Sequence, residues 1–455
     1  MNNLQLVKNN YKIEKVKKST GVGLILMKHC SDRSTVLCNN KIIMDSIETN
    51  VVNREIELHQ QLKHLDCIGF DMDMTITKFD IDQVHRGVIV DTVTGYMLKL
   101  DSQKHVLKAF LGDLQISKEK INDIYHADVI PENRPLAQFS GSNNGRFFVL
   151  NSFFELPLTP LWIGHINHLV AESGVPDGTG YDHGELMRFL KEAVVSFNHS
   201  FGDFYNSRYF REIREDPGKF VHRATDACIA WLKDLKSRGC RVCLITNSKS
   251  EYTHLLMTYA YGPDFQSIFD IIIADAKKPE FFRKPAKFYD LGGNYFPKEL
   301  TEEMLVDAVE FNTPTVYHNG SVQTLIEAVR RHSNKENISF CYVGDHLIGD
   351  VSAPKQHCKW MTIAIVEEIE DEEEIVVLQK KTAGFESKGI GKNYEWGSFF
   401  CFNDHNAGIS SETFWSYVIR HNADIALSSV ETLAKYFNDD KFDKQSLKPC
   451  SIVYN

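Results

Sequence analysis

Four short apolar runs along this chain each end at polar residues, a pattern typical of buried strands in a parallel sheet. Segments with apolar residues at helical spacing separate the later runs, at Ala227–Lys236, Glu251–Tyr261 and Val322–Arg331. The apolar runs are Cys67–Phe70 before Asp71, Val242–Ile245 before Thr246, Ile268–Ile273 before Asp275, and Ile338–Val343 before Gly344-Asp345. Alternating strands and helices predict an α/β fold, with a parallel sheet covered by helices on both faces. Ligands bind such sheets at the carboxyl ends of the strands, where these polar residues should gather.

The long stretch between Thr75 and Thr246 fits this alternation poorly. Helical patterns at Leu161–Ala171 and Gly184–Phe197 predict a largely helical cap over 81–204, placed above the active end of the sheet. The core is then formed by 61–80 and 205–455. His165 and His168 are spaced i, i+3 within the cap and could ligate a metal. No carboxylate or cysteine partner is indicated nearby, so packing histidines are the favoured interpretation.

Composition and charge mainly exclude classes of protein. The 455 residues include 51 basic and 61 acidic side chains, a formal net charge of −10, so the chain lacks the basic surplus of a nucleic-acid binder. No apolar run approaches the ~20 residues that a membrane span needs. Ten cysteines without a framework spacing favour reduced thiols, and hence a cytoplasmic protein. Cys240 and Cys243 lie in an apolar run that predicts a strand, so we interpret them as buried strand residues and not as a redox pair.

Two charged segments stand apart from this globular pattern. The basic N-terminal region predicts a poorly ordered extension over 1–60. A mitochondrial transit peptide is the alternative, against which Glu14 and Asp32 argue. Seven of the eight residues from Glu367 to Glu374 are acidic, which predicts a solvated loop over 367–375. The composition leaves open whether the chain forms a homo-oligomer.

Candidate chemistry begins with Asp71 and Asp73, two carboxylates spaced i, i+2 at the end of a predicted strand. Asp71 can project into a site while the chain begins to turn, and Asp73 can reach back toward the same place. One carboxylate could attack a phosphorus atom while the other supplies and removes the proton. Alone, Asp-x-Asp-x-Thr is short enough to occur by chance in a surface loop, so the other strand ends have to support it.

A second strand end carries Thr246, Asn247 and Ser248. A hydroxyl group, an amide side chain and the free N–H groups of the turn can all donate to phosphate oxygens. Asn247 or Ser248 could also act as the N-cap of the next helix, and the two roles are compatible.

A third strand end carries Asp345 and Asp350, five residues apart. Asp345, Asp71 and the backbone carbonyl of Asp73 would form an oxygen shell for Mg²⁺ that leaves room for water and phosphate. Asp350 should orient that shell and not ligate directly. A lysine would help to offset the repulsion between an aspartate nucleophile and a phosphate monoester. The candidates that follow Asp275 are Lys277, Lys278, Lys284 and Lys287.

In this order, the motifs resemble those of the haloacid dehalogenase superfamily of phosphatases, and within it the cytosolic purine 5′-nucleotidase family. The matching segments are Phe-Asp-Met-Asp-Met-Thr (70–75), Ile-Thr-Asn-Ser (245–248), Ala-Asp-Ala-Lys-Lys-Pro-Glu-Phe-Phe (274–282), Gly-Asp-His-Leu-Ile-Gly-Asp (344–350) and the cap segment Phe-Val-Leu-Asn-Ser-Phe-Phe-Glu-Leu-Pro (148–157). The likeness covers roughly residues 65 to 440, and it implies a Rossmann-like core with an inserted cap.

The resemblance also implies a role for each matching residue. Asp71 resembles the nucleophile that forms an aspartyl-phosphate, and Asp73 the general acid and base. Thr246 and Asn247 resemble the phosphate-holding pair, and Asp345 resembles the metal-binding aspartate. The phosphate lysine of the family has no unambiguous counterpart, because the segment 282–316 diverges. Lys278 is the first choice, with Lys287 and Lys298 behind it.

These features predict a Mg²⁺-dependent phosphomonoesterase that hydrolyses nucleoside 5′-monophosphates. One alternative is a phosphatase for another small phosphomonoester, because caps select substrates. The other is a regulatory or binding protein of low activity on the same fold, since fold alone does not determine function. Cap aromatic residues could stack on a base, although core packing is the commoner use of such side chains. They are Phe147, Phe148, Phe153, Phe154 and Trp162.

Overall fold

The computed structural model describes most of the chain outside its N-terminal region. The described residues are 57–58, 60–73, 75, 86–125, 146–150, 158–173, 204–205, 208–311, 315–369, 396–404, 409–438 and 452–453. Three predicted segments therefore lie wholly or mostly outside the described residues: the N-terminal extension, the helix at Gly184–Phe197 and the acidic run. So do Phe153 and Phe154, and the two predicted limits of the cap stay predictions.

A ten-stranded sheet forms the core, in the order β10-β9-β11-β8-β7-β1-β12-β13-β16-β17. The seven strands from β11 to β16 are parallel, which confirms the predicted parallel sheet, while β9, β10 and β17 add antiparallel edges. In sequence order the strands are Cys67–Phe70 (β1), Arg241–Ile245 (β7), Ile271–Ala274 (β8), Phe288–Asp290 (β9), Leu305–Val306 (β10), Val316–Asn319 (β11), Phe340–Gly344 (β12), Met361–Ile365 (β13), Ile425–Leu427 (β16) and Ile452–Val453 (β17).

One predicted strand begins later than its apolar pattern indicates. The run Ile268–Ile273 becomes strand only from Ile271, because Phe265–Ser267 forms a short 3₁₀ turn that ends at Ile268. The N–H of Ile268 donates to the carbonyl of Phe265 in that turn. Ile268 is still buried, so an apolar run predicts burial more reliably than it predicts where a strand begins.

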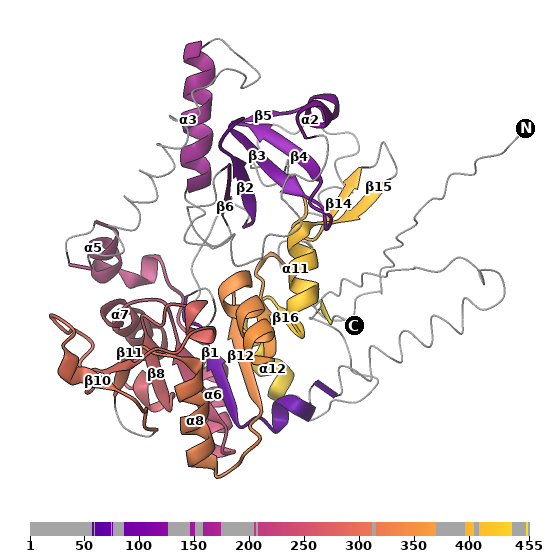
Figure 1. Cartoon of the computed structure of the whole chain (residues 1–455). Helices are drawn as coiled ribbons and strands as arrows, with labels where there is room; N and C mark the ends of the chain where they lie inside the picture. The colour runs from indigo at the N-terminus through magenta and orange to yellow at the C-terminus, as the bar shows by residue number, and fades with distance from the viewer. Residues whose placement is uncertain are drawn as a thin grey trace, which may run out of the picture.

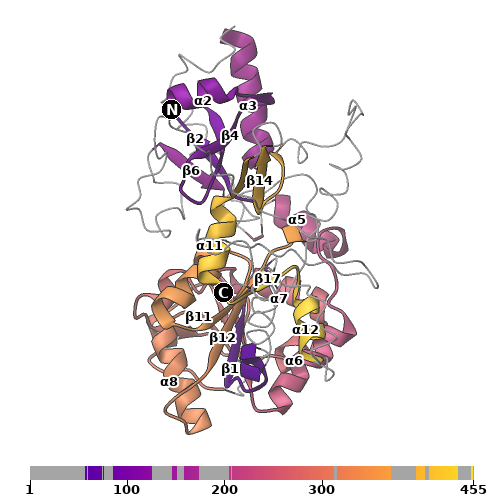
Figure 2. The ribbon, with the colours of Figure 1, turned by 90° about the vertical axis from the view of Figure 1, so that its right-hand side faces the viewer.

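Helices cover both faces of the sheet, as predicted (Figures 1 and 2). Within β7, Val242 and Leu244 pack in one hydrophobic cluster with α6, α7 and α12, whereas Cys243 and Ile245 pack in another with α8. This alternation follows from the period of two along a strand. The helices are α5 (Arg208–Glu215), α6 (Asp226–Ser237), α7 (Ser250–Tyr261), α8 (Val322–Ser333), α11 (Phe414–Asn422) and α12 (Val430–Asn438). The predicted helices within α6, α7 and α8 are thereby confirmed.

The described part of the cap is not largely helical, contrary to prediction. Five antiparallel strands form a second sheet in the order β5-β4-β3-β2-β6. Two helices accompany the sheet, Lys118–Ile124 (α2) and Leu158–Ser173 (α3), and α3 contains the helix predicted at Leu161–Ala171. The strands are Val88–Asp91 (β2), Tyr96–Leu100 (β3), Val106–Leu111 (β4), Leu114–Gln115 (β5) and Phe147–Leu150 (β6).

Two tight turns explain why this sheet forms. Between β2 and β3, the N–H of Gly95 donates to the carbonyl of Asp91, whose side chain accepts from Val93. Between β4 and β5, only Gly112 and Asp113 separate the strands, and Gly112 has a positive φ of 57°, which glycine adopts without strain. Short strands joined by glycine turns are a hairpin pattern, and this signal was available in the sequence.

The cap sheet and the core share one continuous hydrophobic cluster. Strands β2, β3 and β4 pack with α11 and with the turn Leu347–Ser352 (η7), and α11 lies between the two sheets in both views (Figures 1 and 2). Trp415 of α11 donates its indole N–H to the carbonyl of Gly87, at 2.8 Å. A hairpin of Cys401–Asp404 (β14) and Ile409–Glu412 (β15) precedes α11. The cap is therefore built on a C-terminal part of the chain.

Among the described residues, no helix combines the length and the hydrophobicity that crossing a bilayer requires.

Candidate active site

Three adjacent strands bring the predicted site residues to one edge of the sheet. Asp71 follows β1, Thr246 follows β7 and Asp345 follows β12, and β1 lies between the other two. The N–H of Asp71 donates to the carbonyl of Val343 at 2.9 Å, which continues the pairing of β1 with β12 past the strand end. Parallel strands therefore place these three side chains together, as the sequence predicts.

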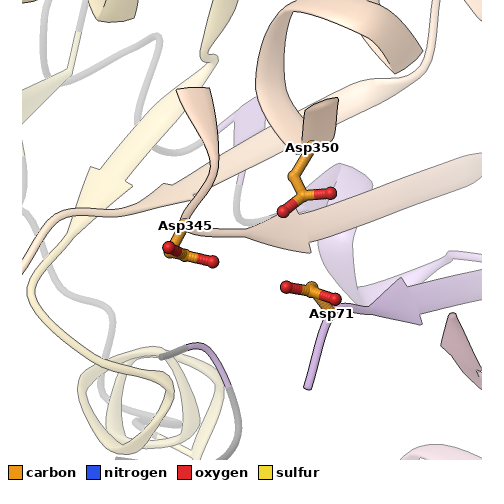
Figure 3. A group of neighbouring side chains, drawn as sticks. All are labelled: Asp71, Asp345 and Asp350. Carbon is orange, nitrogen blue, oxygen red and sulfur yellow. The ribbon is translucent and has the colours of Figure 1, made fainter. Parts of the chain in front are cut away.

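Asp71, Asp345 and Asp350 form a buried carboxylate cluster, with one oxygen of each lying within 4.8 Å of the others. Figure 3 shows the three carboxylates extending toward one another from the end of β1, the end of β12 and the helical turn after it. Gly344 permits this approach, because a Cβ on Gly344 would lie 2.3 Å from the Cβ of Asp350. Any side chain at position 344 would therefore displace Asp350.

The donor set of this cluster fits a hard divalent cation, because all the clustered donors are carboxylate oxygens. Both oxygens of Asp350 have protein partners: Oδ1 lies 2.8 Å from Nζ of Lys278, and Oδ2 accepts from the N–H of His346. The partners of Asp345 are more distant, with Thr75 at 3.4 Å and the guanidinium of Arg86 at 3.8 Å from its two oxygens. Of the three carboxylates, Asp345 therefore has the most distant side-chain partners, whereas Asp71 and Asp350 both contact Lys278.

The buried carboxylates hold their protons more tightly than exposed ones. Burial raises the pKa of Asp71 to about 6, although Lys278 acts in the opposite direction. Burial, and then the charge of Asp71, raise the pKa of Asp73 to about 7. Burial, and then the charges of Asp71 and Asp350, raise the pKa of Asp345 well above its usual range. So much clustered negative charge favours a bound cation.

Of the lysines weighed from the sequence, Lys278 is the one that lies in the site. Its Nζ is 2.6 Å from Oδ1 of Asp71 and 2.8 Å from Oδ1 of Asp350. Burial alone would lower the pKa of Lys278, but the two carboxylates outweigh it and raise that pKa well above the ordinary value. The other candidates lie on the surface: Lys277 pairs with Asp275, Lys284 with Glu280 and Lys287 with Asp307, and Lys298 is exposed.

Asn247 ties the turn after β7 to the lysine. Its Oδ1 accepts from the N–H of Lys278 at 2.6 Å, and its Nδ2 donates to the carbonyl of Lys278 at 2.9 Å. Thr246 is buried beside it, and its Oγ1 accepts from the N–H of Ser248. The alternative that Asn247 or Ser248 caps the next helix is wrong, because the N-cap of α7 is Lys249. These side chains hold the loop that carries Lys278.

Asp73 lies across from this turn, and its carboxylate is separate from the cluster of three. The hydroxyl of Ser248 donates to Oδ2 of Asp73 at 2.6 Å. Oδ1 of Asp73 is buried and has no hydrogen-bond partner among the described residues. A buried carboxyl group with a pKa near 7 and one oxygen left for a substrate has the properties of a general acid.

Two residues that touch the site, Arg86 and Tyr342, were not predicted from the sequence, and neither was the contact of Ser248 with Asp73. Arg86 is buried, donates to the carbonyl of Asp345, and pairs with Glu368 through two hydrogen bonds of 3.0 and 2.8 Å. Glu368 is one of the acidic run expected to be solvated, yet it is buried. Ser248 stood within a recognised motif, whereas nothing in the sequence around Arg86 or Tyr342 indicated their partners.

Other candidates from the sequence lie away from this site. His165 packs beside Trp162 in the cap, and His168 is exposed with Glu172 at 3.3 Å; neither belongs to a metal-type cluster of the described residues. Cys240 and Cys243 are buried free thiols just before and within β7. Trp162 and Phe148 are buried in the core of the cap, which favours packing over base stacking.

Comparison with known proteins agrees with this geometry. Residues 77–390 match the model of the 5′ nucleotidase family. The chain belongs to the 5′-nucleotidase family. It is 27% identical over 404 residues to 5′-nucleotidase domain-containing protein 1 of Bos taurus, covering 83% of this chain and 84% of that protein. The Homo sapiens protein of the same name is 27% identical over 407 residues, with the same two coverages.

Membership of the 5′-nucleotidase family makes the chain a phosphatase, a hydrolase that acts on phosphoric monoesters. The family match includes the positions of Thr246, Asn247, Lys278 and Asp345. The family match begins just after Asp71 and Asp73. These two residues are assigned to the site because they lie beside it at the end of β1. The buried carboxylates, Lys278 and the turn after β7 together form the candidate site for this hydrolysis.

Proposed function

We propose that this 5′-nucleotidase family member is a Mg²⁺-dependent phosphomonoesterase that hydrolyses nucleoside 5′-monophosphates through an aspartyl-phosphate on Asp71. The main support is the position of the Asp71 carboxylate. It lies 2.6 Å from the ammonium group of Lys278 and next to the carboxylates of Asp345 and Asp350. A nucleophile, a cation for the phosphate and a set of hard oxygen ligands thus share one buried space.

In the first step, a carboxylate oxygen of Asp71 forms a bond to phosphorus, and the bond from phosphorus to the 5′ oxygen breaks. Asp73 gives its proton to that leaving oxygen, which is a poor leaving group as an alkoxide. With a pKa of about 7, Asp73 can carry this proton near neutral pH. Lys278 and the hydroxyl of Thr246 hold the phosphate oxygens during the transfer.

In the second step, Asp73 takes a proton from water as the water oxygen attacks the phosphorus of the aspartyl-phosphate. The acyl–phosphate bond breaks, inorganic phosphate leaves, and Asp71 regains its carboxylate. Asp71, Asp345 and the backbone of Asp73 would hold Mg²⁺, with Asp350 orienting them. The ion would supply positive charge that offsets the repulsion between the phosphate and the carboxylates.

A substrate screen of the purified full chain tests this proposal. Nucleoside 5′-monophosphates, nucleoside 3′-monophosphates and sugar phosphates are compared by release of inorganic phosphate, with Mg²⁺ and with excess chelator. We expect the highest kcat/KM for a 5′-monophosphate and no release with chelator. Preference for a sugar phosphate would replace the substrate class, and release that ignores chelator would remove the metal from the scheme.

A further inference from the structure

The hydroxyl group of Tyr342 lies between two parts of the active site that the sequence did not connect. Tyr342 is the third residue of β12 and is fully buried. Its hydroxyl donates to the carbonyl of Ile245 at 2.8 Å and accepts from Nζ of Lys278 at 3.0 Å. Ile245 is the last residue of β7, directly before Thr246. Because the single O–H proton points to Ile245, a lone pair of the phenol oxygen is left for the lysine.

Three oxygens surround the ammonium group of Lys278: two accept hydrogen bonds from it, and the third forms an ion pair with it. They are Oδ1 of Asp71 at 2.6 Å, Oδ1 of Asp350 at 2.8 Å and the hydroxyl of Tyr342 at 3.0 Å. We expect a phosphate oxygen that binds the ammonium in this buried space to take the place of one of them. Asp71 is the acceptor whose carboxylate changes partner when it bonds to phosphorus. Tyr342 and Asp350 remain, and both are held by β12 and the turn that follows it.

The ring of Tyr342 is itself held in place. It lies opposite Gly69 of β1, where an added Cβ would be 2.8 Å from its Cδ2 and 3.1 Å from its Cε2. The ring of Phe282 packs edge-on against it with centroids 5.2 Å apart. Glycine at position 69 thus provides the space that the phenol ring occupies. In β1, which ends at Asp71, the residue opposite Tyr342 is therefore a glycine, and a larger side chain there would displace the tyrosine ring.

We propose that Tyr342 is a positioning residue for the phosphate-binding lysine. Its hydroxyl fixes the ammonium of Lys278 while the contact with Asp71 is exchanged for a contact with the substrate phosphate. Both hydrogen bonds of the Tyr342 hydroxyl go to protein groups, the carbonyl of Ile245 and the ammonium of Lys278, so it would act on the substrate through Lys278. The inference rests on the proposed function of Lys278 in binding phosphate.

Tyr342→Phe tests the proposal, because it removes one oxygen and keeps the ring. We expect kcat/KM for a nucleoside 5′-monophosphate to fall about tenfold, a loss that matches one hydrogen bond to a charged group. The affinity for inorganic phosphate and for vanadate, measured at saturating Mg²⁺, should fall by a similar factor. Tyr317→Phe is the matched control. Tyr317 is equally buried on β11, and its hydroxyl accepts from the N–H of Glu310 at 3.1 Å, outside the site. This control should leave all three values unchanged.

A double-mutant cycle separates positioning from general packing. In a Lys278→Met background the phenol oxygen has no ammonium to hold, so adding Tyr342→Phe should change phosphate affinity by less than about twofold. An equal loss in both backgrounds would overturn the proposal. Gly69→Ala is a second route to the same lysine, because it displaces the ring, and it should weaken phosphate binding in the Lys278 background only.

The binding measurement also distinguishes this inference from the proposed function. If the wild-type protein binds phosphate but turns over no phosphomonoester, the proposed function fails. The double-mutant cycle of Lys278 and Tyr342, measured by phosphate affinity, still decides the role of Tyr342. If Lys278→Met binds phosphate as well as the wild type, the lysine does not hold phosphate and the inference fails. Thermal unfolding of Tyr342→Phe and Tyr317→Phe, compared side by side, shows whether a loss of phosphate affinity comes from a loss of folded protein.

Discussion

The hydroxyl of Ser248 donates to one carboxylate oxygen of Asp73 at 2.6 Å, while the other oxygen of Asp73 is buried without a partner among the described residues. The two oxygens are thus unequal. Since Oδ2 accepts the proton of Ser248, the acidic proton of Asp73 belongs on Oδ1, the oxygen left for the substrate. Ser248 therefore orients the proposed general acid, a role that its place in the turn after β7 did not indicate.

Asp73→Asn should lower kcat by about 10²–10⁴-fold, the usual contribution of a general acid–base group. The backbone carbonyl of Asp73 is unchanged, so the Mg²⁺ requirement should stay nearly the same. Nitrophenyl phosphate has a leaving group that needs little protonation, and its single-turnover release should suffer less than that of a nucleotide. Equal losses for both substrates, or a collapse of Mg²⁺ binding, would show that Asp73 is a structural or metal-binding residue.

The pH profile provides a separate test of the same residue. Asp73 must be protonated for the first step, and burial raises its pKa to about 7. The kcat/KM for a nucleotide should therefore fall as the pH rises above about 7, because the fraction of protonated Asp73 decreases. Ser248→Ala should move this limb to higher pH, since the hydroxyl of Ser248 stabilises the ionised carboxylate. In Asp73→Asn the limb should disappear; if it persists, another group causes it.

Asp71→Asn should abolish turnover, with a loss of about 10⁴-fold or more, because a neutral amide neither attacks phosphorus nor holds Mg²⁺ well. The fold should be retained, since the amide has nearly the shape of the carboxylate. Acid quenching during turnover should trap labelled phosphate on the wild-type protein and not on the variant. Asp275→Asn is the matched control, an aspartate after β8 that pairs with exposed Lys277 outside the site. Wild-type activity in Asp71→Asn would exclude the covalent mechanism.

Asp345→Ala should raise the Mg²⁺ concentration needed for half-maximal activity, and chelation should abolish activity in the wild type. The reason is that a hard cation binds carboxylate and water oxygens, and Asp345 would be one of few protein ligands. Binding of Mn²⁺, followed by its paramagnetic resonance spectrum, reads out the same loss without turnover. Unchanged Mn²⁺ affinity in Asp345→Ala would place the ion elsewhere.

Arg86→Met should both destabilise the protein and weaken Mg²⁺ binding. The substitution leaves Glu368 buried without its partner, a change that typically costs about 3–5 kcal/mol. It also removes the donor to the carbonyl of Asp345. The double variant Arg86→Met/Glu368→Gln removes the unpaired charge of Glu368 and should recover most of the stability in urea unfolding, while its Mg²⁺ requirement stays raised. If both properties recover together, Arg86 acts on stability alone.

Metal-free protein should become less stable as the pH rises through neutrality. The pKa values of Asp71 and Asp73 in the folded state, about 6 and about 7, lie above the value of about 3.9 expected when unfolded. Their contribution to the free energy of unfolding is therefore complete below about pH 4, and it is lost as the pH rises through 6 and 7. Urea unfolding in chelator from pH 5 to 8 measures this loss, and Mg²⁺ should reverse it at pH 8. Asp73→Asn should show a smaller loss, and an identical one would contradict the assignment.

The parts of the site that lie at strand ends could be predicted from the sequence because parallel strands share an edge. Asp71, Thr246 and Asp345 each follow an apolar run, and one rule of sheet geometry brings them together. The side of β12 to which Tyr342 points could not be predicted in this way. A strand buried on both faces is apolar throughout, so its pattern does not separate the two faces. That Tyr342 meets Lys278 depends on Gly69 in another strand.

The cap shows the complementary limit. Its strands have two to six residues, and β6 pairs with β2 across a long intervening segment of chain. An alternating pattern over so few residues is a weak signal, and the sequences of β2 and β6 do not show that the two strands pair with each other. The turn signals at Gly95 and Gly112 were present, yet the stronger apolar pattern of α3 favoured a helical interpretation. Arg86 was missed because its partners, Asp345 and Glu368, lie more than 250 residues away along the chain.

The helix α11 sets a lower limit on the length of a working version of this protein. The family match ends at residue 390, but α11 (Phe414–Asn422) supplies the apolar side chains against which the cap sheet packs. A product truncated at residue 390, whether by a premature stop codon or by an engineer who follows the family boundary, would retain every motif residue. It would also expose the inner face of the cap, and it should aggregate before it could turn over any substrate.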